Sequence, residues 1–403
     1  MPHSARVPFY RWRDRFDPHP ALARLRETEP VSRVTFPMGP LSVPVWLVTR
    51  YSDVREVLNN PALYSNSADR MAEHVAAALG NDAALRLREL TPGPLVVADP
   101  PDHTRLRRVL APEFTVSRMR RLRPRIEEIV TGHLDAMALH GGPVDLVESF
   151  ALPVPSLVIC ELLGVPYADR ADFQRRGAAQ LDRTIGEARR AAAAAESRSY
   201  MAEFVRLQRA DPGSGLLGAL VREHGDELTD ADLIGLGVLL LIAGHETTAS
   251  MLALGTLLLL QHRQQWAMLA DGRAEPDRAV EELLRHLSVV HHPGLRTALR
   301  DTVIGDIAIA RGEMVLCSIP AANRDPELGP DLFDISRKSN GHLAFGHGIH
   351  YCVGAPLARL EMRIALVELI RRFPTLRLAV PSEELAFRPD SVVYGVTKLP
   401  VEW

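Results

Sequence analysis

A long apolar stretch limits what this chain can fold into more than any other part of the sequence. From Leu233 to Leu260 nearly every residue is apolar, and the stretch is long enough to cross a lipid bilayer as a helix. Its middle, however, contains Glu246, and a carboxylate at bilayer depth is costly unless it has a partner. A helix that is apolar on all sides can instead be the central helix of a large globular core. We therefore predict a buried central helix with a polar interruption.

The polar interruption reads A-G-H-E-T-T, from Ala243 to Thr248. Gly244 weakens the helix locally. The hydroxyl of Thr247 can compete for the carbonyl of Ala243, which lies four residues earlier. These residues predict a groove in the helix that holds the carbonyl, the hydroxyl and a trapped water. A helix kink with a glutamate that reaches solvent is the alternative.

A second feature is the glycine-rich loop F-G-H-G-I-H-Y-C-V-G, from Phe345 to Gly354, directly before an apolar helix that starts at Ala355. Glycines on both sides of Cys352 let backbone N–H groups turn towards its sulfur without clashes. Donors aimed at a sulfur favour the thiolate over the thiol. A thiolate that is shielded by Phe345 and followed by a helix N-terminus is a strong electron donor to a metal. The loop therefore predicts an iron site at Cys352.

Zinc binding and simple burial are the alternatives for Cys352. Cysteine and histidine together also make zinc sites, and His342, His347 and His350 are close to Cys352 in the sequence. Structural zinc, however, usually takes four ligands with several cysteines at short spacing, and this chain has no C-x-x-C pair. A buried structural cysteine would need no ligand at all. The pattern of the loop favours iron over both.

Both segments resemble those of one enzyme family. The loop resembles the haem-ligand signature of cytochrome P450 monooxygenases, F-x-x-G-x-[HR]-x-C-x-G, and fits every specified position. The interruption resembles the oxygen-activating segment of their central helix, [AG]-G-x-[DE]-T-[TS]. By this resemblance Thr247 hydrogen-bonds oxygen or its waters at the iron, and Glu246 gates protons from solvent. The catalytic residues implied are Ala243, Gly244, Glu246 and Thr247.

A third segment, E-E-L-L-R, places Glu282 and Arg285 three residues apart, on one helical face. Such pairs are common on solvated helices. The position of this one, between the central helix and the cysteine loop, resembles the E-x-x-R motif of the P450 family, which an arginine further along the chain completes. Here that arginine is Arg337. We predict a buried structural cluster that does not take part in chemistry.

Haem carries two propionates, so a haem site needs cationic or hydrogen-bonding partners at one edge of the ring. In D-P-P-D-H-T-R-L-R-R a helix can begin near Asp102, which places His103 and Arg107 on one face. An exposed basic helix face is the alternative for this pair. The resemblance adds Arg296 to these partners. The full cofactor-binding set implied is His103, Arg107, Arg296, Phe345, Gly346, His350, Cys352 and Gly354.

Composition is compatible with a large enzyme domain. The 403 residues can bury a substantial core. The net charge of -3 gives no electrostatic reason to bind nucleic acid. The N-terminal residues lack the apolar core of a signal peptide or membrane anchor, and three widely spaced cysteines suit a reducing cytoplasm. We expect a soluble cytoplasmic monomer that binds neither nucleic acid nor a membrane.

The resemblance implies a mainly α cytochrome P450 fold, with a large helical domain and a smaller β-rich region. It implies one haem-thiolate domain over residues 1–403, with heme b between the central helix and the cysteine loop. It also implies insertion of one oxygen atom from O2 into a C–H bond, by hydroxylation or epoxidation. Electrons would come from NAD(P)H through ferredoxin reductase and ferredoxin. A basic patch is one candidate docking face for ferredoxin, with solvated helix faces as the alternative: Arg105, Arg108, Arg359 and Arg363.

The substrate is expected to be bulky and hydrophobic, because the predicted pocket walls are mostly apolar. The candidate pocket residues are Leu239, Ile242, Ala243, Val290, His291, His292, Leu295, Val393 and Tyr394. A macrolide or related polyketide intermediate is our preferred substrate. The alternatives are a P450 that oxidises foreign compounds, terpenoids or steroids, a peroxide-driven haem peroxygenase, and a non-enzymatic haem sensor.

Overall fold

The computed structural model describes residues 8–38, 41–79, 95–181, 185–338, 341–389 and 391–403. The chain forms two compact units. Unit 1 comprises residues 1–108, 290–331 and 341–352, and unit 2 comprises residues 109–289, 332–340 and 353–403. Each unit is built from several separate segments of the chain. The single domain expected over residues 1–403 stays a prediction.

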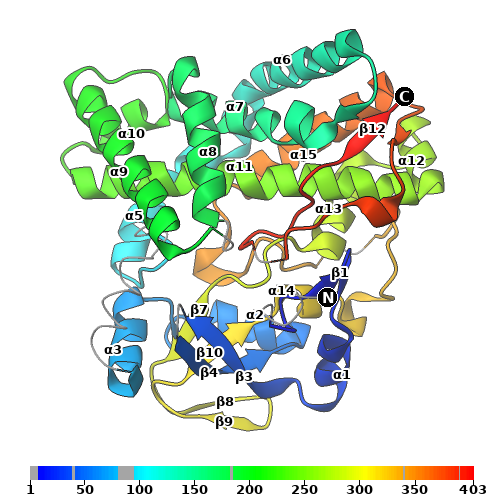
Figure 1. Ribbon diagram of the computed structural model, residues 1–403. Coiled ribbons are helices and arrows are strands. Elements are labelled where there is room, and N and C mark those ends of the chain that lie inside the picture. The colour runs from blue at the N-terminus through cyan, green and yellow to red at the C-terminus, as the bar shows by residue number, and fades with distance from the viewer. Residues whose placement is uncertain (1–7, 39–40, 80–94, 182–184, 339–340, 390) are drawn as a thin grey trace. The chain divides into compact units, whose positions relative to one another are not determined.

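A five-stranded sheet organises unit 1 (Figure 1). Across the sheet its strands are β3 (Val31–Met38), β4 (Leu41–Val48), β10 (Met314–Cys317), β7 (Leu295–Ala298) and β5 (Tyr64–Ser65). β3 and β4 pair antiparallel, whereas β10 pairs in parallel with β4 and antiparallel with β7. The middle strand therefore comes from the second half of the chain.

Side chains of this sheet alternate between two hydrophobic clusters, because successive residues of a strand point to opposite faces. Val45 and Leu47 of β4 belong to one cluster, and Val48 belongs to the other. The same alternation separates Leu316 from Val315 in β10. The sheet is thus covered by apolar side chains on both faces.

Short helices and two small hairpins complete unit 1. The helices are α1 (Pro20–Thr28), α2 (Tyr51–Asn59), α3 (Ala68–Leu79), α5 (Asp102–Leu110) and α14 (Ile319–Ala322). The hairpins are β1 (Arg13–Asp14) with β2 (Asp17–Pro18), and β8 (Thr302–Ile304) with β9 (Ile307–Ile309). The start of α5 at Asp102 agrees with the start predicted from the sequence.

Unit 2 is mainly helical. Its helices are α6 (Val116–His140), α7 (Pro153–Leu163), α8 (Arg170–Leu181), α9 (Glu187–Ala210), α10 (Leu216–His224), α11 (Asp230–Gln261), α12 (Arg263–Ala270), α13 (Pro276–Leu287) and α15 (Ala355–Arg372). A small sheet joins β11 (Arg377–Leu378), β12 (Pro400–Glu402) and β6 (Val144–Asp145). The predicted combination of a large helical part and a smaller β-rich part is confirmed.

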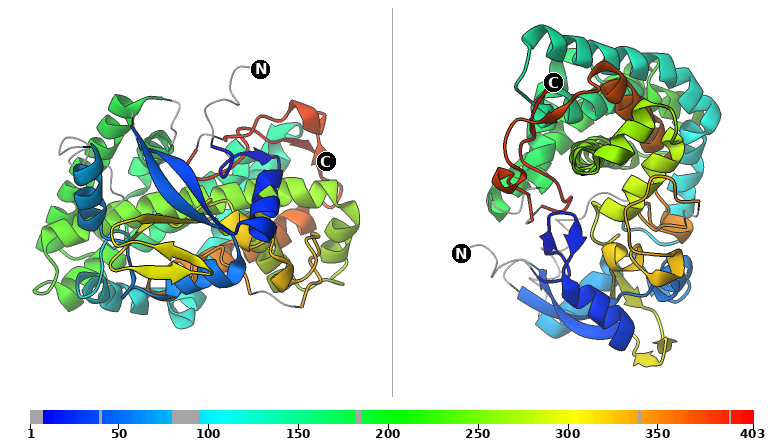
Figure 2. Two further views of the ribbon diagram at one scale, coloured as in Figure 1. Left: turned by 90° about the horizontal axis from the view of Figure 1, so that it is seen from below. Right: turned by 90° about the vertical axis from the view of Figure 1, so that its right-hand side faces the viewer.

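The predicted apolar helix is α11. Thr229 and Asp232 begin it with a capping box, in which each side chain accepts a hydrogen bond from the backbone N–H of the other. The right-hand view of Figure 2 looks along α11, with other helices of unit 2 around it. Length and composition alone would also suit a membrane span, but 56% of its most apolar window is buried inside the protein. The burial confirms a central core helix.

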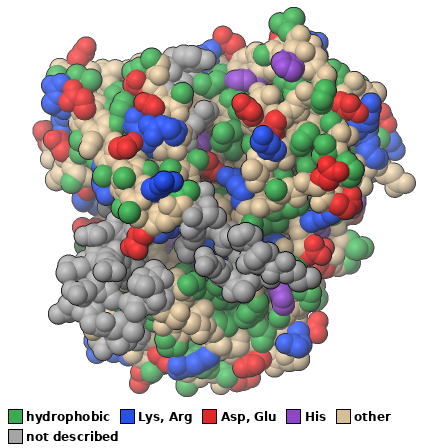
Figure 3. Space-filling view, viewed as in Figure 1, with side chains coloured by type: hydrophobic (Ala, Val, Ile, Leu, Met, Phe, Trp, Pro, Cys, Tyr) green, Lys and Arg blue, Asp and Glu red, His purple; other side chains and the backbone are tan. Residues whose placement is uncertain are grey.

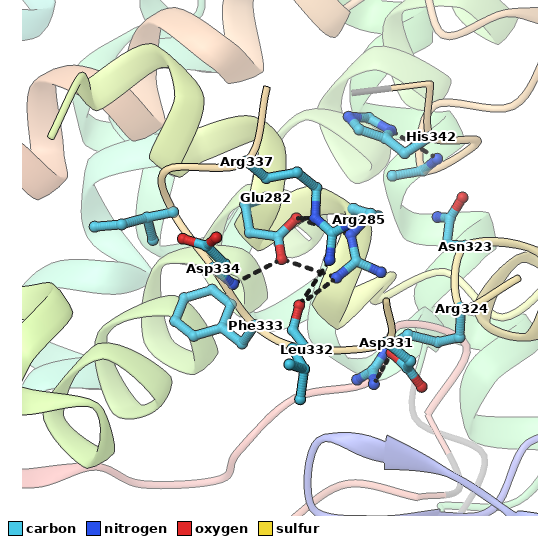
Figure 4. A network of polar contacts seen from close by, with 12 residues as sticks. Glu282, Arg285, Asn323, Arg324, Asp331, Leu332, Phe333, Asp334, Arg337 and His342 are labelled. Carbon is cyan, nitrogen blue, oxygen red and sulfur yellow. Dashed lines mark hydrogen bonds and ion pairs between the residues drawn. The ribbon is translucent and has the colours of Figure 1, made fainter. Parts of the chain in front are cut away.

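The predicted ion cluster lies within unit 2 (Figure 4). The carboxylate of Glu282 accepts hydrogen bonds from Arg285 Nε at 2.7 Å and Arg285 Nη2 at 2.8 Å. Arg337 Nε lies 3.1 Å from the same carboxylate, and the backbone N–H of Asp334 donates to it at 3.0 Å. Both arginines also donate to the carbonyl of Leu332. Because α13 supplies the first pair and residues 332–337 the rest, the cluster ties a later segment to that helix.

Loss of the central carboxylate is expected to destabilise the protein strongly. Glu282→Ala leaves two arginines largely buried without their anion, and breaking a buried pair in this way costs about 3–5 kcal/mol. Urea denaturation of the variant measures this loss. Glu203→Ala on α9 is the matched control, because its partner Arg206 is as exposed as Glu203 itself, and it should change stability little. Equal effects of the two substitutions would contradict a stabilising role for the cluster.

Candidate functional site

The loop before Cys352 takes its shape from two glycines and from α2. Gly346 has φ of 72° and Gly348 has φ of 70°, a region that favours glycine. A Cβ on Gly348 would also collide with the carbonyl of Leu58 at the end of α2. The backbone N–H of Cys352 donates to the carbonyl of Phe345 at 2.9 Å, which closes the loop. Inward-turned N–H donors to the sulfur stay a prediction.

Basic side chains of unit 1 gather near this loop. His103 of α5 is 3% exposed, and its ring lies 4.3 Å from that of His350, centre to centre. Burial lowers the pKa of Arg107, while Cys352 and Tyr351 act in the opposite direction. The structure thus brings together predicted site residues from α5 and from the cysteine loop.

The electrostatics of this cluster favour an anion. Burial, followed by the neighbouring Arg296, His103 and Arg107, lowers the pKa of His350 to about 3. Burial also lowers the pKa of His103, so the two arginines are the permanent positive charges of this cluster. Nε2 of His103 is buried and has no hydrogen-bond partner among the described residues. Carboxylates such as the haem propionates would supply both the missing charge and the missing partner, so the residues present fit the cofactor that the sequence implies.

Two residues that the sequence analysis missed hold Arg296 in place. The Arg296 guanidinium donates to the side-chain carbonyl of Asn66. Asp99 in turn accepts from the backbone N–H of Asn66 at 2.9 Å and from the hydroxyl of Ser65. No local pattern indicates this link, because Asn66 and Arg296 are 230 residues apart.

The polar interruption of α11 forms the second candidate site, in unit 2. The hydroxyl of Thr247 donates to the carbonyl of Ala243 at 2.8 Å, so the predicted contact is confirmed. Leu239, Ala243 and Thr247 follow at intervals of four and share one face. This face is only partly buried, whereas Leu240 and Leu241 beside it are buried. An apolar surface with one hydroxyl group is therefore open on α11.

The room predicted beside Gly244 is filled by a neighbouring helix. α11 is helical without interruption from Asp230 to Gln261. A Cβ on Gly244 would come within 2.7 Å of Cγ1 of Ile159. The missing side chain at Gly244 thus lets α7 pack closely on α11, and the trapped water predicted beside Thr247 stays a prediction.

Glu246 is buried, which rules out the alternative of a solvent-reaching glutamate. It is 1% exposed, and its Oε2 lies 3.3 Å from Nη1 of Arg388. Nη2 of Arg388 also donates to the hydroxyl of Ser250 at 2.9 Å. Arg388 was not found from the sequence, since 142 residues separate it from Glu246. A buried carboxylate with one partly exposed cationic partner can exchange protons with solvent only through a few side chains.

The remaining predicted pocket residues are mostly packed into the two units. Leu295 belongs to the hydrophobic cluster that contains Phe36, and the ring of His292 lies against Phe36 at 5.6 Å. His291, Val393 and Tyr394 are buried, and Val290 is partly buried. The roles of these residues in substrate binding stay predictions.

The predicted basic patch is partly neutralised. Arg359 makes a two-point ion pair with Glu281, at 2.5 and 2.9 Å, and Arg363 lies 3.6 Å from Asp277. Figure 3 shows basic and acidic side chains interspersed over the face that it views. Within the described ranges, no three side chains of His, Cys, Asp or Glu come together as metal ligands, and the zinc alternative gains no support there.

Comparisons with known proteins match the chain to one family. The family model for cytochrome P450 matches residues 277–390. Cytochrome P450 FAS1 of Rhodococcoides fascians is 43% identical over 407 residues and all of both chains. Pentalenic acid synthase of Streptomyces avermitilis is 43% identical, with 96% of this chain and 95% of the relative covered. The solved structure of OxyE, a P450 involved in teicoplanin biosynthesis, superposes with a TM-score of 0.87 at 40% identity and covers 98% of this chain and all of its own.

The suppressed protonation of His350 makes stability depend on pH when no anion is bound. In the unfolded chain this histidine takes up a proton near its ordinary pKa of 6.5, whereas the folded chain resists protonation until about 3. The contribution of His350 to the free energy of unfolding is therefore complete above pH 6.5, and it is lost as the pH falls towards 3. His350→Gln should flatten the fall in urea midpoint over this range in the haem-free protein. His140→Gln, at an exposed position, is the control. An unchanged slope in His350→Gln would contradict this assignment.

Proposed function

This chain belongs to the cytochrome P450 family, and we propose that it is a monooxygenase that hydroxylates or epoxidises a bulky apolar secondary metabolite. Membership in the family implies haem with a cysteine thiolate ligand. When bound, haem supplies the activation of O2 with electrons from outside. The protein has to bind the cofactor, orient the substrate and deliver protons. Each of these tasks has candidate residues.

Cofactor binding falls to unit 1. Cys352 would hold the iron through its sulfur, in a loop whose shape is fixed by glycines and by α2. His103, Arg107, Arg296 and His350 would hold the propionates. The observation that carries this proposal is the convergence of four basic side chains on one site, with a suppressed pKa at His350 and an unpartnered Nε2 at His103.

Proton delivery falls to the polar residues of α11. The Thr247 hydroxyl donates its one hydrogen to the carbonyl of Ala243, so its oxygen would accept a hydrogen bond from oxygen-bound protons or waters at the haem. Glu246 would pass protons inward from the partly exposed Arg388 side. The separation of a buried carboxylate from a more open hydroxyl on adjacent residues supports this division of roles.

The substrate class rests on the open face of α11. Leu239 and Ile242 are apolar and only partly buried there, and Ala243 is exposed, so apolar contacts would dominate binding. Relatives at closely similar identity include both pentalenic acid synthase and a P450 involved in teicoplanin biosynthesis, which indicates chemically different substrates. Within secondary metabolism we favour a macrolide or related polyketide intermediate.

Electron supply is part of the same proposal. A ferredoxin and its NAD(P)H-dependent reductase would supply electrons to a cytoplasmic monomer. The ion pairs of Arg359 and Arg363 reduce the charge that unit 2 can offer to an acidic partner. Arg108 of α5 is exposed and is a second candidate contact. Charge reversal at Arg108 and at Arg359 would distinguish the two surfaces by the salt dependence of electron transfer.

Titration with a set of macrolides is expected to shift the haem absorption, because a substrate bound on the open face of α11 would change the surroundings of the cofactor. The carbon monoxide complex should absorb as a thiolate-ligated haem, and Cys352→Ser should lose this spectrum. A globin-like complex in the unaltered protein would contradict the enzyme assignment. A normal thiolate spectrum without any macrolide response, but with a response to steroids or terpenoids, would contradict the substrate class alone.

Thr247→Ala is expected to uncouple oxygen consumption from product formation, because the variant loses the hydroxyl that passes protons. Product formed per O2 consumed should fall about ten-fold, equivalent to about 1.4 kcal/mol in the competition between the two outcomes. Oxygen uptake and product yield are measured together. Thr248→Ser, a change that the family pattern tolerates, is the control. Unchanged coupling in Thr247→Ala, or peroxide-supported turnover equal to ferredoxin-supported turnover, would contradict the proton-delivery role.

A further inference from the structure

The helices α8 and α9 both pack on α11, and each makes one especially close contact with it (Figure 1). Met201 of α9 lies over Gly237 of α11, where a Cβ would come within 2.5 Å of the Met201 sulfur. On α8, the backbone of Gly177 lies against the imidazole ring of His245, where a Cβ would come within 2.8 Å of Nε2. The first contact is apolar, whereas the second involves the ionisable ring of His245. His245 directly precedes Glu246 in the sequence.

Among the described residues, the ring of His245 makes a hydrogen bond through only one of its two nitrogens. Its Nδ1 lies 2.7 Å from the carbonyl of Leu241, one turn earlier in the helix. A carbonyl can only accept, so Nδ1 carries the proton of the neutral ring and Nε2 is left as an acceptor. Nε2 is buried and has no hydrogen-bond partner among the described residues. It lies 3.7 Å from Oε1 of Glu246, which is beyond hydrogen-bond distance.

Glu246 thus lies between two different groups. Its Oε2 faces Arg388, a permanent cation, and its Oε1 faces a ring that can give or take a proton. Arg388 is fixed by Ser250 and by Gly395, where a Cβ would come within 2.6 Å of Nη2. His245 is the one that Gly177 of α8 contacts.

We propose that His245 is a positioning residue that couples the seating of α8 on α11 to the orientation of Glu246. With α8 seated, Gly177 shields Nε2 from water, and Glu246 is the nearest polar group that can satisfy it. A small rotation of the Glu246 side chain would close the 3.7 Å between Oε1 and Nε2 to hydrogen-bond distance, with one hydrogen between the two atoms. If the contact with Gly177 is lost, water can reach Nε2 and take the place of Glu246. The inference rests on the proposed role of Glu246 in proton delivery.

Two substitutions at His245 distinguish the roles of its two ring nitrogens. His245→Asn keeps a donor for the carbonyl of Leu241 and removes the atom at the Nε2 position. His245→Gln places an amide near the Nε2 position and removes the bond to Leu241. We expect product per O2 consumed to fall about ten-fold in His245→Asn, as for the loss of one buried polar contact, and to stay near the original value in His245→Gln. Hydrogen exchange of α8 amides should be unchanged in His245→Asn.

Gly177→Ala tests the contact between α8 and His245 by changing α8 instead of the histidine. The added methyl group overlaps the ring, so exchange of α8 amides should become about ten-fold faster, as overpacking predicts. Product per O2 consumed should fall with it. Ala171→Ser, at an exposed position of the same helix, is the matched control and should change neither quantity. All variants are compared as haem-loaded proteins.

Three outcomes would overturn the inference. His245→Asn could match the unaltered protein in coupling, His245→Gln could be as impaired as His245→Asn, or Gly177→Ala could speed exchange in α8 without changing coupling. If Gly177→Ala does not fold, the two variants of His245 decide. If the protein forms no product from O2 at all, the proposed function fails separately, and the exchange measurement on Gly177→Ala still tests the contact between α8 and His245.

Discussion

The helix α11 is apolar around its whole circumference, and the packing of the rest of unit 2 follows from burying it. Exposed apolar surface on α11 would cost about 25 cal/mol for each Å² left in water, so neighbouring helices have to pack on it from several directions. Glycines make the closest of these approaches possible. Gly244 admits Ile159 of α7, and Gly237 admits Met201 of α9. One stretch of the helix is left less covered, and the polar residues of the candidate site adjoin it.

Three buried charged groups of the two candidate sites and the ion cluster share one feature. Each has a partner that is distant in the sequence but fixed by the fold: Asn66 holds Arg296, Arg388 holds Glu246, and Arg337 completes the Glu282 cluster. Burying a charge without such a partner is expensive. The partners therefore preserve the charge of residues that the site needs. They also fix those side chains before a cofactor or substrate arrives, which reduces the entropy lost on binding.

Much of this site could be predicted from the sequence, because its parts are local. The cysteine loop, the A-G-H-E-T-T segment and the α5 pair His103 and Arg107 are each defined within ten residues. The contact between Thr247 and Ala243 follows from helix geometry alone. Asn66, Arg388 and Gly177 could not be found in this way, because their roles come from contacts between segments far apart in the chain. Gly244 was recognised but misinterpreted, since a missing side chain predicts space and does not say which neighbour fills it.

The strand order of unit 1 has a consequence for how the protein is made. β10 lies between β4 and β7, yet it is separated from β4 by more than half of the chain. On the ribosome, β3 and β4 emerge first and present an open edge until β10 has been translated. Unpaired edges attract other strands. Vectorial synthesis therefore leaves the nascent polypeptide exposed to misassociation for a period, during which the helices of unit 2 from α6 to α13 can already form.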